Sequence, residues 1–407
     1  MAGLLPVADA LARVLAGATA LPEEWLPLAE ADGRVLSRDL VATRTQPPAA
    51  VSAMDGYAVR AADLPGSLTV IGESAAGRPF SGTLPAGTAL RIFTGAELPD
   101  GADTIVIQED TARHGDHVSV ATSSPRGRHI RPQGLDFAEG MVGLTAGTRL
   151  DPRKLALAAA MNHARVPVHR APRVAILSTG DELIEPGSTP GPGQIVSSNA
   201  LAVALLVRRE GGIATDLGIC PDRLDATLAA VRGARQAGFD ILVTSGGASV
   251  GEYDLMRDVI EHEGAELGFW KIAMRPGKPL MMADLGPMRL LGLPGNPVAS
   301  FVCSTIFLLP LLRKLAGRRD IEAATEEATF AVDVGPNDLR ADYLRASLDW
   351  RDGRLVATPA PVQDSSMIRV LAEADALVLR APHAPAAPAG SPCRIIRLSQ
   401  RGLPPAG

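Results

Sequence analysis

Aromatic residues are scarce in this 407-residue sequence, and cysteine is scarcer. Phe, Trp and Tyr together make up 3% of the chain, while its three cysteines, Cys220, Cys303 and Cys393, lie far apart. Three widely spaced cysteines indicate neither a disulfide framework nor a Cys-x-x-Cys metal site, so we expect a protein of the reducing cytoplasm. Positive charge is not in excess either: the net charge of -5 argues against a general nucleic-acid or anionic-membrane binder. An anionic ligand must be held by local cations.

Long apolar runs are also missing. The longest, residues 298–312, is short for a bilayer and contains Ser300, Ser304, Thr305 and Pro310, so we interpret it as a buried helix. The N-terminus has no basic segment ahead of its apolar residues, and no secretory signal is expected there. We find no internal repeat.

The length suggests two to four domains at about 150 residues each, and the pattern divides the chain into four parts. Helices are predicted at 7–16, near 24–31 and after Asp151, which can cap a helix that begins with Pro152. We therefore expect a helical linking domain made of residues 1–45 and 145–170. Short apolar runs between Pro, Gly and Asp turns predict a small β domain, 46–144, inserted into it.

Residues 171–320 alternate between strand and helix patterns, which is typical of a doubly wound parallel sheet in an α/β domain. Residues 321–407 return to short β runs and predict a small C-terminal β barrel or sandwich. The predicted fold class is therefore a multidomain α/β plus β protein.

Three glycine-bearing turns directly follow predicted strands of the α/β domain, at 178–182, 244–247 and 293–297. Because parallel strands end at one edge of a sheet, we expect the three turns to meet in one crevice. Uncovered backbone amides in such turns, and the helix that opens after Asn296, favour an anionic ligand. A glycine-rich turn taken alone is as often only a means of fitting a helix against a sheet.

Charged residues are expected at the same edge. Asp181, Glu182, Asp222 and Asp254 would repel a phosphate unless a cation mediates, which suggests Mg²⁺. Each of them could equally cap a helix or lie in solvent. Lys271, Lys278 and Arg275 carry charge suited to phosphates and oxyanions, with solvated salt bridges as the alternative.

Six stretches taken together resemble one family: residues 52–58, 91–95, 178–183, 244–254, 269–279 and 292–297. They are similar, in order and over nearly the whole chain, to the molybdopterin molybdenumtransferases, the bacterial MoeA-type enzymes related to the E domain of gephyrin. The resemblance implies a homodimer whose active cleft lies between the α/β domain of one subunit and the β domain of the other. It also implies insertion of molybdate into adenylylated molybdopterin with release of AMP and with Mg²⁺ as cofactor.

The resemblance assigns site residues by motif. Catalytic roles are expected for Asp55, Thr94, Asp136, Glu182, Asp254, Lys271 and Arg275, and metal binding for Glu182, Asp222 and Asp254. Binding of the cofactor precursor is expected from Arg131, Thr179, Gly180, Ser245, Gly246, Gly247, Ser249, Lys278, Pro294, Asn296, Pro297 and Ser365. Expected partners are a second subunit, a molybdopterin adenylyltransferase and proteins that receive the finished cofactor, with no nucleic acid and no membrane.

The sequence departs from the family pattern in places. Arg275 stands where many members carry Lys, and Ala374-Asp375 replaces a common Ala-Asn. Two other functions stay open at this point. One is the adenylyltransferase of the preceding step, which is similar to residues 171–320 alone; the other is a non-catalytic carrier or scaffold for the cofactor.

Overall fold

The computed structural model describes residues 4–246 and 255–399. The chain forms two compact units. The first comprises Met1–Glu24, Gly33–Ser37 and Val168–Gly407, and the second comprises Trp25–Asp32 and Arg38–Pro167.

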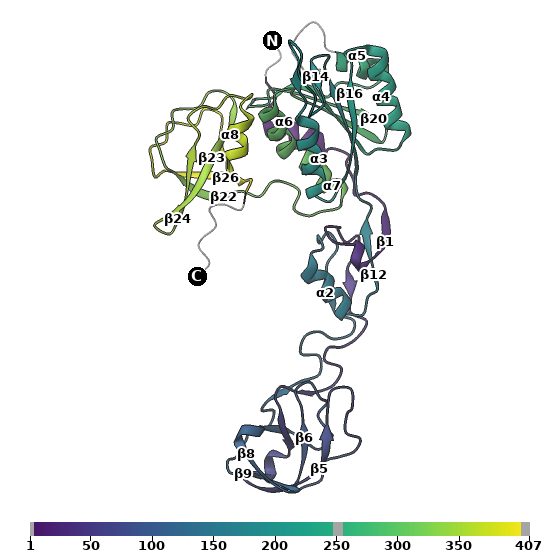
Figure 1. Cartoon of the computed structure of the whole chain (residues 1–407), viewed down its shortest axis with the longest axis vertical. Coiled ribbons are helices and arrows are strands. Elements are labelled where there is room, and N and C mark those ends of the chain that lie inside the picture. Colours follow the sequence, from purple (N-terminus) through teal and green to yellow (C-terminus); the bar gives the residue numbers. More distant parts are fainter. Residues whose placement is uncertain (1–3, 247–254, 400–407) are drawn as a thin grey trace. The chain divides into compact units, whose positions relative to one another are not determined.

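A six-stranded sheet lies at the centre of the first unit (Figure 1). In spatial order its strands are β16 (Ile213–Cys220), β13 (Arg173–Thr179), β17 (Ile241–Ser245), β21 (Met288–Leu293), β20 (Pro279–Leu285) and β18 (Phe269–Lys271). The first four strands run parallel, whereas β20 is antiparallel to both of its neighbours.

Both faces of this sheet are covered by helices because consecutive apolar residues of its strands point to opposite sides. On one face, Val174 and Ile176 share a core with α3 (Asn199–Arg209) and the helical segment Pro297–Leu315. On the other face, Ala175 and Leu177 pack with α4 (Leu224–Gln236) and α5 (Leu255–His262). The predicted doubly wound arrangement is therefore confirmed.

The longest apolar run is a core helix, as predicted. It consists of α6 (Pro297–Cys303), a π-helical turn η4 (Ser304–Leu308) and α7 (Leu309–Leu315). By length and composition this segment could cross a membrane, but 83% of its most apolar window is buried inside the protein. Burial against the sheet explains its apolar composition.

The N-terminal helix α1 (Val7–Leu15) belongs to the α/β core. Its Ala10 and Val14 are fully buried in the same cluster as α7, and the Leu5 amide donates to the Lys271 carbonyl at 2.9 Å. The structure thus differs from the expectation that residues 1–45 pack as one with 145–170, because the first 24 residues group with the sheet. The burial of the apolar face of α1 explains this placement.

The C-terminal region is a closed five-stranded barrel (Figure 1). Pairing between β23 and β25 closes the ring. The five strands are β22 (Glu326–Phe330), β23 (Ala341–Arg351), β24 (Arg354–Pro359), β25 (Ala376–Arg380) and β26 (Pro392–Arg397). The two-residue strand β19 (Met274–Arg275) adds to β23 from outside the ring, and α8 (Ile368–Glu373) lies before β25. The predicted barrel is confirmed.

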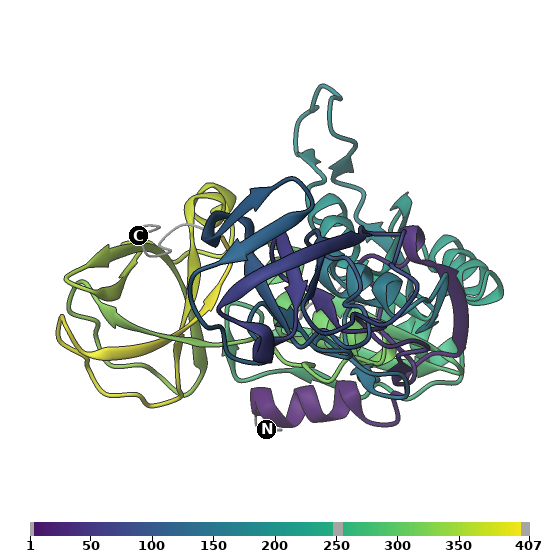
Figure 2. The ribbon, with the colours of Figure 1, turned by 90° about the horizontal axis from the view of Figure 1, so that it is seen from below.

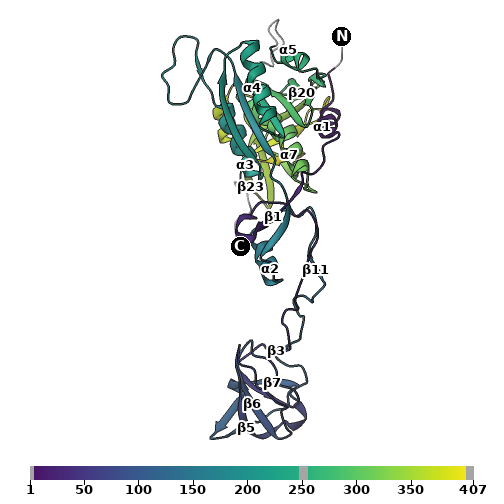
Figure 3. The ribbon, with the colours of Figure 1, turned by 90° about the vertical axis from the view of Figure 1, so that its right-hand side faces the viewer.

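A loop projects from the first unit between β14 (Leu183–Ile184) and β15 (Ile195–Val196), two short paired strands. Figures 2 and 3 both show this Pro/Gly-rich loop, in teal, extending away from the sheet.

The second unit contains a six-stranded sheet and a small helix-bearing region. In spatial order the sheet has β7 (Thr104–Ile107), β4 (Gly56–Val59), β6 (Thr88–Ile92), β5 (Gly66–Ser74), β9 (His117–Val120) and β8 (Thr111–His114). Two-stranded ladders join β3 (Val51–Ser52) to β10 (Ile130–Arg131), β2 (Leu40–Val41) to β11 (Val142–Leu144), and β1 (Glu23–Pro27) to β12 (Arg165–His169). Short 3₁₀ turns occur at η1 (Leu28–Glu30), η2 (Ala61–Asp63) and η3 (Gln108–Asp110).

The linking region is less helical than predicted. Its helix α2 (Pro152–Ala160) begins as expected, because the Asp151 carboxylate accepts from the amides of Arg153 and Lys154. The helix predicted near 24–31 is wrong, since β1 and η1 occupy that stretch. Pairing of β1 with β12 satisfies the backbone there in an extended form.

Candidate active site

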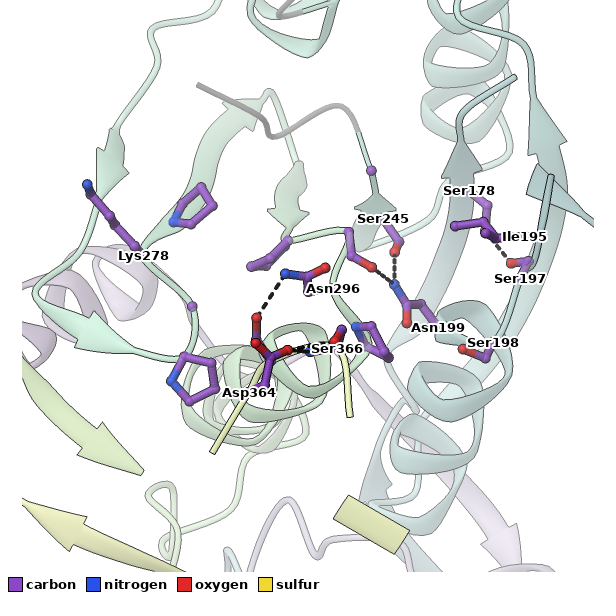
Figure 4. A pocket seen from close by; sticks show the side chains of 18 of the residues that line it. Ser178, Ile195, Ser197, Ser198, Asn199, Ser245, Lys278, Asn296, Asp364 and Ser366 are labelled. Carbon is purple, nitrogen blue, oxygen red and sulfur yellow. Dashed lines mark hydrogen bonds between the residues drawn. The ribbon is translucent and has the colours of Figure 1, made fainter. Parts of the chain in front are cut away.

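A cavity of about 940 Å³ opens at the carboxyl ends of the parallel strands (Figure 4). Ser178 on β13 lies opposite Ser245 on β17, and Ser245 lies opposite Leu293 on β21. This register brings the turns after all three strands to one edge, as topology requires. Residues of each turn line the cavity: Ser178, Thr179, Glu182, Ser245, Gly246, Pro294, Gly295, Asn296 and Pro297.

Gly246 lets the β17 turn approach the β13 turn closely. A side chain at this position would place its Cβ 2.2 Å from the Thr179 carbonyl oxygen, and φ at Gly246 is +98°. Only glycine fits this combination of contact and backbone angle. Gly180, with φ +146°, lies in the neighbouring turn, where the Glu182 carboxylate folds over it.

Asn199 joins two of the turns, and sequence reasoning did not identify it. Its Nδ2 atom donates to Ser245 Oγ at 2.8 Å and to the Gly295 carbonyl at 2.7 Å (Figure 4). Asn199 is the first residue of α3, so the helix holds the amide in place. Because Ser245 Oγ accepts this bond, its own hydroxyl hydrogen can point elsewhere. The signal in the sequence was the polar run Ser197-Ser198-Asn199 ahead of an apolar helix.

The barrel supplies the opposite wall of the cavity through residues 363–366. Asn296 Nδ2 donates to Ser365 Oγ at 2.9 Å, and the Val298 amide donates to the Ser365 carbonyl at 3.2 Å. Asn296 does occupy the N-cap position of α6, but its side chain makes no capping bond. The side chain instead connects the α/β domain to the barrel.

Of the predicted cations, Lys278 lines the cavity, and its ammonium group makes no ion pair with any residue that the structure describes. Lys271 is exposed on β18 and does not line the cavity. Arg340, which sequence reasoning missed, also lines the cavity and pairs with Asp338 at 3.0 Å.

Arg275 differs from the prediction of an oxyanion clamp. Its Nε donates to Asp342 Oδ1 at 2.7 Å, and its Nη2 donates to Asp342 Oδ2. This hydrogen-bonded carboxylate raises the pKa of the guanidinium. Two of the donors needed for a bidentate clamp are already used, because Asp342 on β23 lies directly opposite Arg275 in the β19–β23 ladder.

The predicted acidic residues gather only in part. The Asp222 amide donates to Asp181 Oδ1 at 3.1 Å. The pKa of the Asp222 carboxyl is raised, first by partial burial and further by repulsion from Asp181 and Glu182. Within residues 4–246 and 255–399, no group of three His, Cys, Asp or Glu side chains is placed to hold a metal ion. The predicted Asp254, Gly247 and Ser249 lie outside these residues.

The second unit holds a separate pair of predicted residues, Asp55 and Thr94. Asp55 Oδ1 accepts from the Thr94 amide at 2.7 Å and from Thr94 Oγ1 at 2.8 Å. These two bonds, the amide first, lower the pKa of the Asp55 carboxyl, and the nearby Arg91 cation lowers it further. Arg91 is held over the Tyr57 and Phe93 rings and donates to the Gly56 carbonyl. Asp55 is therefore an oriented, ionised carboxylate.

Arg131 and Asp136 line a second cavity, of about 530 Å³, in the same unit. Arg44, Gln46 and Glu97 share its wall, but neither Asp55 nor Thr94 does. The four predicted residues of the β domain therefore lie in two places: Asp55 and Thr94 form an exposed pair, and Arg131 and Asp136 line the second cavity.

Three family models together match most of the chain. The MoeA N-terminal region (domains I and II) matches residues 5–162, a probable molybdopterin-binding domain matches 175–314, and the MoeA C-terminal region (domain IV) matches 327–398. These matches and the fold define a MoeA-type protein built around a molybdopterin-binding α/β domain.

Relatives and solved structures narrow this class. The molybdopterin molybdenumtransferase of Haemophilus influenzae is 40% identical over 73% of this chain and 74% of its own length. That of Bacillus subtilis is 34% identical over 92% of this chain and 90% of its own. The crystal structure of the molybdopterin biosynthesis MoeA protein of Pyrococcus horikoshii OT3 superposes with a TM-score of 0.83 at 27% identity, and the match covers 97% of this chain and all of that one. The chain belongs to the molybdopterin molybdenumtransferase family.

Proposed function

We propose that this protein inserts molybdate into adenylylated molybdopterin and releases AMP, which yields the molybdenum cofactor. The observation that carries this proposal is the cavity at the edge of the parallel sheet. It is large enough for a nucleotide-bearing ligand, its walls carry hydroxyls and amides, and Lys278 reaches it as a cation free of any described carboxylate. The names of the relatives support the same reaction.

The cavity residues divide by chemistry. Ser178, Ser245 and Ser365 offer hydroxyls to phosphate or oxyanion oxygens, while Lys278 offsets their negative charge. Cleavage of the phosphoanhydride bond that releases AMP needs such neutralisation, because charge grows on the leaving phosphate. The barrel loop 363–366 is part of the wall, so an adenylyltransferase built from the α/β domain alone would lack it.

Mg²⁺ is part of the proposal. The chemistry of the donors fits, since carboxylate oxygens are the ligands that Mg²⁺ prefers. Partial burial raises the pKa of Asp222, and repulsion from Asp181 and Glu182 raises it further. Glu182, which lines the cavity, and Asp222 would hold the ion together with Asp254. When bound, Mg²⁺ would neutralise phosphate charge.

We further propose that the protein works as a cytoplasmic homodimer. Asp55 and Thr94 in the second unit form an oriented carboxylate that does not line the neighbouring cavity of Arg131 and Asp136. A cleft shared between subunits would give Asp55 a substrate to act on, with Asp55 of one chain facing the strand ends of the other. Its expected partners are the adenylyltransferase that makes its substrate and the proteins that receive its product.

The test is AMP release from adenylylated molybdopterin and Mg²⁺ by purified protein, with and without molybdate. We expect release that depends on molybdate and stops when Mg²⁺ is chelated. Tight binding of the substrate without release would contradict the proposal and favour a carrier, after tungstate has been tried as the alternative oxyanion.

A further inference from the structure

The segment 274–279 belongs to two sheets at once. It connects β18 to β20 in the α/β sheet, yet its first two residues form β19, which pairs with β23 of the barrel. The Ala341 amide also donates to the Ala273 carbonyl at 2.8 Å. All six residues of this segment line the cavity. The cavity wall therefore depends on how the barrel is held against the α/β domain.

Arg275 connects the segment 274–279 to the barrel through its side chain. It makes two bonds to Asp342, and its Nη1 and Nη2 atoms lie 3.4 Å from Asp338 Oδ2 and Asn337 Oδ1. All three partners belong to the barrel. Asp342 is only 5% exposed, so its carboxylate needs this partner. A guanidinium with its donors used in this way is poorly placed to clamp an oxyanion as well.

The strand that carries Asp342 also holds the opposite wall of the cavity. Three residues further along β23, the Arg345 amide donates to Gln363 Oε1 at 2.9 Å, and the Gln363 amide group donates back to the Arg345 carbonyl at 3.0 Å. Arg345 Nη2 reaches the Asp364 carbonyl at 3.2 Å. Arg275 is thus linked through β23 to the loop 363–366.

We propose that Arg275 is a positioning residue, which acts through Asp342 to fix the barrel loop 363–366 opposite the turns of the α/β domain, and that it does not bind the anionic substrate itself. This inference rests on the proposed function for its activity readout. It gives Arg275 a different task from the oxyanion clamp that the sequence suggested, and it leaves substrate charge to Lys278.

Asp342 supplies the decisive variant. We compare Arg275→Met, Asp342→Asn and the double variant by kcat and KM for adenylylated molybdopterin and for molybdate, with each folded fraction checked by circular dichroism. Each single change should lower kcat/KM about tenfold in folded protein, and the double variant should be no worse than Arg275→Met, because contacting residues couple. Arg275→Lys should recover part of the loss, since it restores a cation beside the buried carboxylate.

Matched controls come from the same strand. Arg351 and Asp349 form an exposed pair on β23 at 2.8 Å, and Arg351→Met and Asp349→Asn should leave activity unchanged. The proposal is overturned if Asp342→Asn keeps or lowers the substrate KM while Arg275→Met raises it, because a freed guanidinium would then be binding substrate. If Arg275→Met does not fold, the substrate KM of Asp342→Asn is compared with that of Arg275→Lys instead, by the same criterion.

A second readout needs no substrate. We measure the thermal unfolding midpoints of the wild type, Arg275→Met, Asp342→Asn and the double variant. The decrease in the double variant should be smaller than the sum of the two single decreases. A decrease equal to that sum would contradict an interaction between Arg275 and Asp342. A wild-type protein that releases no AMP would defeat the proposed function, and the midpoints would still decide whether Arg275 and Asp342 act together.

Discussion

The cavity of the first unit and the Asp55–Thr94 pair of the second unit are built by different means. The cavity is made mainly by backbone turns that the order of parallel strands forces to one edge. Asp55 is fixed instead by two bonds from one residue 39 positions away. Topology positions the first site, whereas individual side-chain contacts position the second. A single substitution should therefore affect the second site more severely.

The largest effect is expected from Asp55→Ala. Loss of an oriented carboxylate should lower kcat for AMP release by about a hundredfold or more without unfolding the protein. Steady-state kinetics measure this, with Asp116→Ala as the control, because Asp116 is an exposed aspartate in the turn between β8 and β9 of the same unit. A near-normal kcat in Asp55→Ala would show that the Asp55 carboxylate takes no part in the reaction, which contradicts a functional site in the second unit.

Lys278→Met should act on binding instead. Removing this cavity cation should raise KM for the anionic substrates by about tenfold to a hundredfold and should reduce the salt dependence of KM. Lys154→Met is the matched control, because Lys154 lies on α2 and does not line the cavity. A loss confined to kcat would mean that Lys278 acts on the transition state and not on binding.

Asn199→Ala tests how far the turns depend on a side-chain brace. The change leaves Ser245 Oγ and the Gly295 carbonyl without their donor, and a lost bond of this kind costs about 1–3 kcal/mol of stability. We expect a lower thermal midpoint together with an activity loss of about tenfold, since displaced turns misplace the substrate. Full activity would show that strand register alone sets the cavity.

The smallest effect concerns the protonation of Asp55. Thr94 donates twice to this carboxylate and lowers its pKa, so Asp55 stays ionised to lower pH than an ordinary aspartate. Thr94→Val removes the hydroxyl donor and keeps the amide, and the pKa should rise toward its ordinary value. Carboxyl titration by NMR, assigned with Asp55→Asn, measures the shift and would contradict this account if it were downward or absent.

The strand and helix alternation in 171–320 was enough to predict the doubly wound sheet and the meeting of its turns, because strand direction follows from the repeating pattern. Side-chain partners could not be predicted in this way. Asn199 and Arg340 were missed, and the partner of Arg275 is Asp342, 67 residues away on another domain. The helix predicted near 24–31 failed because pairing with β12 outweighed its local helical pattern.

The roles given to Asp55, Thr94, Arg131 and Asp136 came from family resemblance alone. Nothing in the spacing of these residues indicates that Asp55 accepts two bonds from Thr94, or that Arg131 and Asp136 face a different hollow. Their joint action with the cavity of the first unit stays a prediction.

Mixing two impaired variants, assayed at substrate concentrations far below the wild-type KM, tests that joint action most directly. In a dimer with shared clefts, Asp55→Ala and Lys278→Met chains that are unfolded and refolded together should form heterodimers in which one of two sites is intact. Random assembly then restores about a quarter of wild-type AMP release. That recovery is the predicted result. If the mixture stays as impaired as its parts at this substrate concentration although heterodimers are present, Asp55 and Lys278 do not complete a site across subunits.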